Sequence, residues 1–185
     1  MIQIDGCRWR WIFLSVTGLF LALVLFGCGR APQQAPVSDV VAEKALAIAL
    51  TKLDAPYALG GRGPDAFDCS GLITWAYKQA LGKDGVFRVG RRVTTDANML
   101  DIYRDNVQMI PFESASPGDI VFITDQPETV THGGLFIGWK DANTLEFINA
   151  SSYEPYRKVV VDTWPVQGSK RGQRLVGIGR LLCVL

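Results

Sequence analysis

The stretch FDCSGLITWAYKQALG, Phe67 to Gly82, contains a cysteine at the point where a helix is expected to begin. Apolar residues recur in this stretch at helical spacing, which predicts an amphipathic helix with one buried face. Asp68 is a good N-cap, because a carboxylate accepts hydrogen bonds from the free amides of the first turn. Gly82 stands where a helix commonly ends in the left-handed conformation. These signals place Cys69 at the start of the helix.

Cys69 has two interpretations at this position. Unpaired amides and aligned peptide dipoles at a helix start favour an anion, so the thiol is expected to ionise easily and to act as a nucleophile. The alternative is a buried structural cysteine that falls early in a helix by chance. The choice between the two depends on whether the rest of the chain supplies chemical partners.

The composition is that of one ordinary domain with a core of its own. The chain has 185 residues, 48% of them hydrophobic, and a formal net charge of +1. Basic and acidic residues are interspersed without a basic stripe, which argues against nucleic-acid binding.

Residues 1–27 have the pattern of a bacterial lipoprotein signal peptide. Arg8 and Arg10 precede an uncharged apolar run that ends in LFGC, which resembles a lipobox. We expect cleavage before Cys28 and acylation of that cysteine. An uncleaved membrane anchor is the alternative, because the run lies at the short end of what spans a bilayer.

Residues 28–38 are predicted to be the acylated cysteine followed by a flexible Pro/Gln tether, because they show no periodic pattern. Residues 39–185 are predicted to be the folded domain. Gly29 is not the aspartate that often retains lipoproteins in the inner membrane. The predicted location is therefore the outer membrane, facing the periplasm, with inner-membrane or cell-surface anchoring as alternatives.

The elements are expected to run from helices to strands. This order predicts an α+β fold, with N-terminal helices packed on a mostly antiparallel sheet of five to six strands. The predicted helices are 39–53, with Asp39 as cap, 69–81, and 94–106, with a threonine start; the predicted strands are 120–124, 131–139, 144–151, 157–162 and 175–185.

Cys69 and Cys183 are the cysteines expected to remain in the domain. They could form a disulfide in an oxidising compartment, and such a bond would silence a nucleophile. Cys183 lies in an apolar C-terminal run, where a free cysteine packs as a small hydrophobe, and this is the preferred interpretation.

His132 is the single histidine of the chain, so a Cys–His mechanism has to use it. It opens a predicted strand, and Gly133 and Gly134 leave room beside its ring. A lone histidine is more often structural, so its value as evidence depends on its neighbours.

Asn149 is expected to be such a neighbour if 131–139 and 144–151 form a hairpin. In one register His132 and Asn149 face each other directly, and in the next wider one they are diagonal neighbours on the same face. An amide oxygen there would orient the imidazole toward a thiol. The alternative is that Asn149 merely ends a strand.

The order Cys69, His132, Asn149 supplies a nucleophile, a base and an orienting group, as in cysteine hydrolases. Backbone amides at the helix start, including that of Cys69, are expected to stabilise an oxyanion. One histidine and distant cysteines give no spacing for metal ligands, so neither a metal nor a cofactor is predicted.

The stretches YALGGRGPDAFDCSGLITWAY, SPGDIVFI, THGGLFIG and FINASS resemble the NlpC family of cysteine peptidases over about residues 41–185. The resemblance implies a papain-like α+β core and cleavage of peptidoglycan stem peptides, commonly beside D-glutamate and diaminopimelate. It implies Cys69 as nucleophile, His132 as base and Asn149 as third polar residue.

The resemblance also implies that Tyr57, Asp68 and Ser70 line the site and contact the polar terminus of the substrate. Asp68 therefore has two expected tasks, capping the helix and contacting the ligand. Gly60 and Gly61 are expected to allow close backbone approach.

The chain departs from the family pattern in three places. The third polar residue is often histidine in such proteins, and Asn149 cannot carry a charge. Residues 82–116 do not align with the pattern and are a candidate wall of the substrate groove. Residues 169–174, SKRGQR, are expected to be a solvated loop, with glycan or phosphate contact as the alternative.

The leading hypothesis is a lipid-anchored cysteine endopeptidase of the cell wall. Its expected partners are peptidoglycan peptides, a membrane reached through Cys28, and accessory cell-wall proteins, but not nucleic acid. The alternatives are a catalytically silent binding or scaffold protein on the same fold, and a Cys–His acyltransferase or amidase with another substrate.

Overall fold

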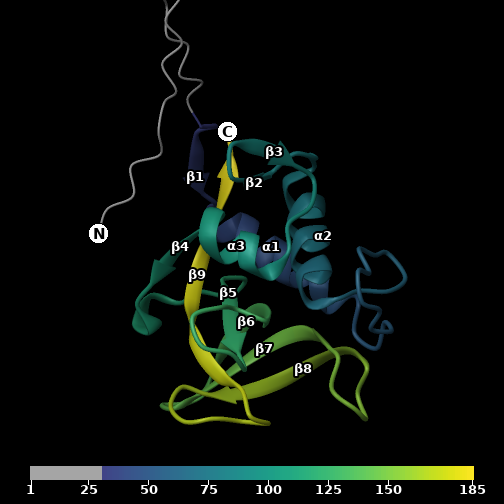
Figure 1. Ribbon diagram of the computed structural model, residues 1–185, viewed down its shortest axis with the longest axis vertical. Coiled ribbons are helices and arrows are strands. Elements are labelled where there is room, and N and C mark those ends of the chain that lie inside the picture. The colour runs from purple at the N-terminus through teal and green to yellow at the C-terminus, as the bar shows by residue number, and fades with distance from the viewer. Residues whose placement is uncertain (1–30) are drawn as a thin grey trace, which may run out of the picture. The chain divides into compact units, whose positions relative to one another are not determined.

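The computed structural model describes residues 31–185, and Figure 1 shows how their elements are arranged. The signal peptide predicted for residues 1–27 and the acylation predicted for Cys28 lie outside these residues. Within the described part, the helices are α1 (Asp39–Leu50), α2 (Cys69–Leu81) and α3 (Met99–Asp105), and Phe112–Ser114 form a 3-10 turn. The strands are β1 (Gln34–Pro36), β2 (Phe87–Val89), β3 (Arg92–Thr94), β4 (Val107–Ile110), β5 (Ile120–Thr124), β6 (His132–Asp141), β7 (Thr144–Ser151), β8 (Lys158–Pro165) and β9 (Arg174–Val184).

The predicted α+β class is confirmed, with a main sheet of seven strands in the described residues. The strands follow the order β1-β9-β5-β6-β7-β8, β4 also pairs with β9, and all these pairs are antiparallel. The long β9, yellow in Figure 1, pairs with β1, β4 and β5 along its length. The sheet exceeds the predicted five to six strands because β1 and β4 were not predicted.

The flexible tether predicted for residues 28–38 is wrong at Gln34–Pro36, which form β1. Gln34 pairs with Val184 of β9, and its side-chain amide donates to Asn106 Oδ1 at 3.2 Å. A three-residue strand is too short to show hydrophobic alternation. For this reason no sequence pattern predicted β1.

Two helix starts also differ from the prediction. Ser38, rather than Asp39, caps α1, with its hydroxyl accepting a hydrogen bond from the amide of Val41. The helix predicted over 94–106 begins at Met99 instead, because Asn98 caps it by accepting from the amide of Asp101 at 2.9 Å. Ser38 and Asn98 are both favourable N-cap residues. They lie close in sequence to Asp39 and Thr94, the starts that were predicted, and these residue types are also favourable caps.

The two faces of the sheet bury different clusters, because successive strand side chains point to opposite sides. Helices α1 and α2 pack on one face, where α2 buries Leu72, Ile73 and Tyr77. The other face carries a smaller aromatic cluster. Its fully or nearly buried members are Val121, Ile123, Phe136, Leu145, Phe147, Trp164 and Ile178.

The SPGD motif ties the helices to the sheet. Asp119 is fully buried, and its carboxylate accepts from Arg180 at 2.9 and 3.1 Å, so its charge is paired. The carbonyl of Gly118 accepts a hydrogen bond from the Tyr77 hydroxyl at 2.7 Å. A Cβ on Gly118 would lie 2.1 Å from the Ala42 carbonyl oxygen. Helix α1 can therefore pack against the turn before β5 only because residue 118 has no side chain. This motif fixes α2, and with it the candidate nucleophile, against β5.

No helix in residues 31–185 has both the length and the apolar character that crossing a membrane requires.

Candidate active site

Cys69 is the first residue of α2, as predicted. The Asp68 carboxylate accepts from the amide of Gly71 at 2.7 Å, and Gly82 ends the helix in the left-handed conformation with φ 64°. Cys69 and Cys183 are both free, so the alternative of a disulfide between them is wrong. Cys183 lies in β9 and packs partly buried against the core, which agrees with the preferred interpretation.

Asp68 is held from several sides beside the nucleophile. Besides capping α2, it accepts from Arg62 Nη1 at 2.6 Å, Ser70 Oγ at 2.9 Å and the Gly60 amide at 3.0 Å. Burial raises the pKa of Asp68, but hydrogen bonds from Arg62, Gly71 and Ser70 outweigh it, and the net pKa is lowered. Asp68 is therefore a carboxylate whose capping task the structure shows directly.

The glycines before the helix serve two separate purposes. Gly60 has φ +76°, which glycine adopts at no steric cost, and no heavy atom lies within 4 Å of a Cβ placed there. Gly61 is the point of close approach, because a Cβ on Gly71 would lie 1.9 Å from its carbonyl oxygen. Gly61 thus closely approaches the backbone of Gly71, and contact of Gly60 and Gly61 with a substrate stays a prediction.

His132 and Asn149 meet as the sequence predicts. Leu135 pairs with Ile148, which is the wider of the two predicted registers and makes His132 and Asn149 diagonal neighbours. His132 Nε2 lies 3.0 Å from Asn149 Oδ1, and Asn149 is 2% exposed. An amide oxygen only accepts, so Nε2 carries the proton and Nδ1 is left as the basic nitrogen.

The start of α2 meets the start of β6, the strand that His132 opens. The backbone amide of Gly133, the residue after His132, lowers the pKa of the Cys69 thiol, as do the amides of Ser70 and Cys69, so Gly133 lies next to the sulfur. A Cβ on Gly133 would lie 2.4 Å from the Val121 carbonyl oxygen, so strand packing also requires this glycine. The structure therefore places His132 against Asn149 and Cys69 next to Gly133, the residue that follows His132; the catalytic roles of the three residues stay a prediction.

The predicted easy ionisation of Cys69 is wrong for the substrate-free protein. Burial raises the pKa of the Cys69 thiol to about 11, the Asp68 carboxylate adds to this, and the donating amides lower it only in part. Burial likewise lowers the pKa of His132, although Asn149 and Asp162 oppose it. At neutral pH Cys69 is therefore a thiol and His132 a neutral imidazole.

Tyr57 lies on the same side of the site as Asp68. Burial raises the pKa of its hydroxyl, and Cys69 and Asp68 add to the shift, so the three groups are electrostatic neighbours. The guanidinium of Arg157 lies 5.8 Å from the Tyr57 ring centroid. The sequence-predicted residues Tyr57, Asp68 and Ser70 thus surround the nucleophile, with Ser70 only 3% exposed.

Residues 82–116 reach the site through two contacts. Asp96 pairs with Arg62 at 2.7 Å, and Arg62 in turn holds Asp68. Met99 packs behind the catalytic strand, since a Cβ on Gly133 would lie 2.5 Å from its methyl group. This segment supports the site from behind.

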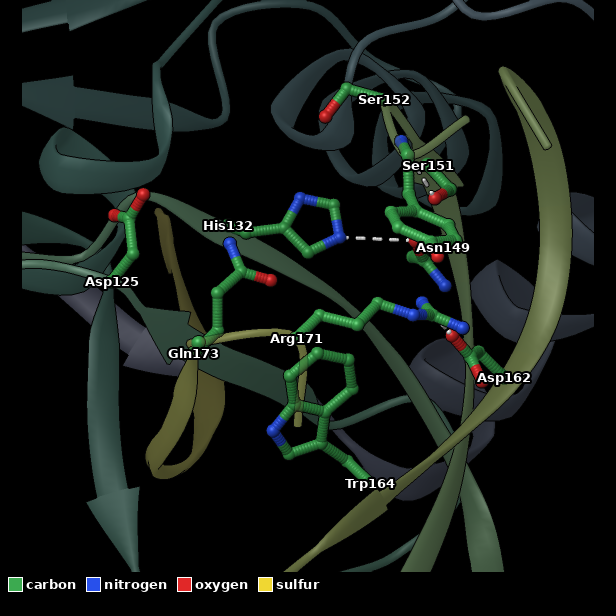
Figure 2. Close-up of a pocket in the computed structure, with 11 residues that line it drawn as sticks. Asp125, His132, Asn149, Ser151, Ser152, Asp162, Trp164, Arg171 and Gln173 are labelled. Atoms are coloured by element: carbon green, nitrogen blue, oxygen red, sulfur yellow. Dashed lines mark hydrogen bonds and ion pairs between the residues drawn. The ribbon is translucent and has the colours of Figure 1, made fainter. Parts of the chain in front are cut away.

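A cavity of about 270 Å³ opens beside the His132–Asn149 pair, as Figure 2 shows. The remaining residues that line it are Asp125, Ser151, Ser152, Tyr153, Asp162, Trp164, Arg171, Gly172 and Gln173. The solvated loop predicted for 169–174 agrees with the exposure of most of its residues, Arg171 among them, and Arg171 Nη1 also donates to Asp162 Oδ2 at 2.8 Å. No sequence pattern predicts that Arg171 contacts Asp162 in strand β8. The pair of cations at Lys170 and Arg171 is the only signal that pointed to this loop.

The donor set for a metal ion is poor in the part of the chain that the structure describes. In residues 31–185 no three histidine, cysteine, aspartate or glutamate side chains converge on one point. The chemistry that these residues support is acyl transfer by a thiol and an imidazole.

Comparison with known proteins agrees with this arrangement. Residues 54–177 match the model of the NlpC/P60 family. The chain is 35% identical to the probable endopeptidase Rv2190c of Mycobacterium tuberculosis over 126 residues, 66% of this chain and 27% of that protein. It is 32% identical to the probable endopeptidase p60 of Listeria grayi over 129 residues, 70% of this chain and 20% of that protein. The chain thus spans about a quarter of the length of these curated relatives or less.

Solved structures share the fold. NlpC1 from Trichomonas vaginalis superposes with a TM-score of 0.54 at 30% identity, over 80% of this chain and 47% of that one. A Staphylococcus aureus protein of the NLP/P60 family, described as similar to lipoprotein, superposes with a TM-score of 0.51 at 25% identity, over 80% of this chain and 44% of that one.

Proposed function

Because this chain belongs to the NlpC/P60 family, we propose that it is a cysteine endopeptidase that hydrolyses amide bonds in peptidoglycan stem peptides. The bond we propose is the one between D-glutamate and diaminopimelate. The observation that carries the proposal is the 3.0 Å hydrogen bond from His132 Nε2 to Asn149 Oδ1, with the Cys69 sulfur next to Gly133, the residue that follows His132. Relatives named probable endopeptidases support it.

The proposed reaction begins from the neutral pair. As the Cys69 sulfur attacks the amide carbon, its proton passes to Nδ1 of His132, so no free thiolate has to accumulate. The charge that develops on the carbonyl oxygen is stabilised by backbone amides at the start of α2. Asn149 holds the imidazole in place while the ring gains a positive charge.

The second half of the reaction returns the proton. The imidazolium of His132 protonates the leaving nitrogen, the C–N bond breaks, and an acyl group remains on Cys69. His132 then removes a proton from water, which attacks the thioester, and the thiol is regenerated. Tyr57, Asp68 and Ser70, with the turn at Gly60 and Gly61, are proposed to bind the acyl half of the substrate.

The proposed location is a membrane surface outside the cytoplasm, with the outer membrane facing the periplasm as first choice. The proposal rests on the LFGC pattern and on acylation of Cys28. The description of the related Staphylococcus aureus protein as similar to lipoprotein supports it. Incorporation of labelled palmitate into the wild-type chain, and its loss in Cys28→Ser, would test this anchor. Label retained by Cys28→Ser would refute it.

Digestion of purified muropeptides by the full chain, with products identified by mass, tests the proposed function. We expect cleavage between D-glutamate and diaminopimelate, and none by Cys69→Ala. Equal processing by the two proteins would favour a silent scaffold. A Cys69-dependent reaction on acyl donors but not on muropeptides would favour an acyltransferase or amidase with another substrate.

A further inference from the structure

We propose that the cavity beside the His132–Asn149 pair receives the leaving half of the substrate, and that the guanidinium of Arg171 binds a carboxylate carried by that half. The inference rests on the proposed function and adds to it a binding site and a residue that determines specificity.

The position of the cavity indicates which half of the substrate it receives. In an amide hydrolysis the acyl half is bonded to Cys69, whereas His132 protonates the nitrogen of the leaving half. Within residues 31–185, the lining of this cavity includes His132 and Asn149 but neither Cys69 nor Tyr57. The group that occupies it therefore lies beyond the base, on the side of the leaving nitrogen.

Asp162, Lys170 and Arg171 form a cluster of three charges at one wall of the cavity. The Asp162 side chain is 10% exposed, and its two oxygens accept from Lys170 Nζ and Arg171 Nη1, each at 2.8 Å. Two cations meet one carboxylate, so one positive charge remains. Lys170 also donates to the Thr163 carbonyl and does not line the cavity, whereas Arg171 does. Arg171 is therefore the cation of this cluster that faces the cavity.

Arg171 is held in position before any ligand arrives. Its guanidinium carbon lies 4.2 Å from the ring centroid of Tyr153 and 5.3 Å from that of Tyr156. Figure 2 shows the side chain reaching across the cavity toward Asp162, beside Trp164. The bond to Asp162 uses Nη1, and the planar fork offers further donors that suit a carboxylate. Such preorganisation reduces the entropy cost of binding.

Asp125 is the other carboxylate on the cavity wall, and it has a local partner. Its Oδ1 accepts a hydrogen bond from the Thr131 hydroxyl at 2.8 Å. It is exposed to solvent, where water and salt screen its charge more strongly than that of the Asp162 cluster. Ser152 and Gln173 add neutral donors to the same wall.

The test uses two tripeptides, L-alanyl-γ-D-glutamyl-diaminopimelate with the carboxyl groups of its leaving residue either free or amidated. For the wild-type full chain we expect kcat/KM to favour the free acid by about 10- to 100-fold, the usual range for a charge-assisted hydrogen bond. Arg171→Gln should remove this preference by slowing only the free acid. Arg171→Lys, which keeps the charge but loses the fork, should retain part of it. Arg174→Gln removes a charge from the same segment outside the cavity and should leave the preference intact.

Equal wild-type rates on the two tripeptides would overturn the inference while leaving the hydrolase function in place. An equal loss of kcat/KM on both tripeptides in Arg171→Gln would also overturn the inference, because it would show that Arg171 has a structural role and does not bind the carboxylate. Absence of Cys69-dependent cleavage of either tripeptide and of muropeptides would instead refute the proposed function, and this inference with it.

Discussion

Nε2 of His132 lies 3.0 Å from Oδ1 of Asn149, and this bond determines which ring nitrogen serves the thiol. The amide oxygen can only accept, so the proton stays on Nε2 and Nδ1 is free to take the proton of Cys69. Figure 2 shows the second ring nitrogen pointing away from Trp164. Nδ1, which in the proposed reaction takes the thiol proton and returns it to the leaving nitrogen, is thus the ring nitrogen that Asn149 leaves free.

Replacing Asn149 with alanine should lower kcat much more than it lowers stability. The imidazole would lose the group that fixes its tautomer, and we expect kcat to fall by about 100-fold, the lower end of what general acid–base catalysis contributes. Asn149→His, which offers a ring nitrogen as acceptor, should restore part of the activity. Steady-state kinetics and urea denaturation measure the two effects.

The matched control for this experiment is Asn143→Ala in the exposed β6–β7 turn, which should change neither quantity. If Asn149→Ala unfolds the protein, or if its kcat equals that of Asn143→Ala, Asn149 is a structural residue and the orienting role is wrong.

The pH dependence of kcat/KM should follow the neutral form of His132. Burial lowers the pKa of His132 below its ordinary value of 6.5, and only the unprotonated ring accepts a proton from the thiol. The rate should therefore be full at neutral pH and fall as the pH drops through that lowered pKa. Because the pKa of Cys69 is about 11, we expect no second titration between pH 7 and pH 9. An alkaline decline near pH 8 would show that an imidazolium–thiolate pair is the active form.

Alkylation of Cys69 should be slow at neutral pH and accelerate toward its pKa of about 11. Asp68→Asn should speed the neutral reaction, because it removes the negative charge that raises the thiol pKa but keeps an oxygen able to cap the helix. Iodoacetamide labelling over a pH series, in a Cys183→Ser background that leaves one thiol in the described domain, measures this. An unchanged pH profile in Asp68→Asn would mean that Asp68 does not control the thiol.

The elements with strong local signals could be predicted from the sequence. Asp68 and Gly82 mark the two ends of α2 by cap chemistry that depends only on neighbouring residues. The hairpin of β6 and β7 brought His132 and Asn149 to one face because strand side chains alternate with a period of two. Local rules were sufficient wherever the catalytic groups lie on regular elements.

Features that depend on the packing of distant segments could not be predicted. The short strands β1 and β4 exist because β9 offers them a backbone edge, and neither carries a pattern of its own. The thiol pKa was predicted in the wrong direction, because burial outweighs the helix start. At the cavity, Arg171 bonds to Asp162 across a turn and packs on the ring of Tyr153, which belongs to an earlier loop.

Gly71 is expected to be a steric requirement of the active site, although the sequence alone gives it no role. A Cβ at this position would lie 1.9 Å from the Gly61 carbonyl oxygen, so Gly71→Ala must push the start of α2 away from the loop that holds Asp68. We expect a loss of about 1–3 kcal/mol in the free energy of unfolding, as for other overpacked sites. The fraction that remains folded should also lose activity, because Cys69 moves with the helix start.

Gly138→Ala in β6 is the matched control, since no heavy atom lies within 4 Å of a Cβ placed there. Its free energy of unfolding should change by no more than about 0.5 kcal/mol, and its kcat should be that of wild type. Urea denaturation of both variants gives the comparison. If Gly71→Ala is as stable and as active as Gly138→Ala, the contact between Gly61 and Gly71 does not position the nucleophile, and the support for Cys69 must come from the Asp68 cap alone.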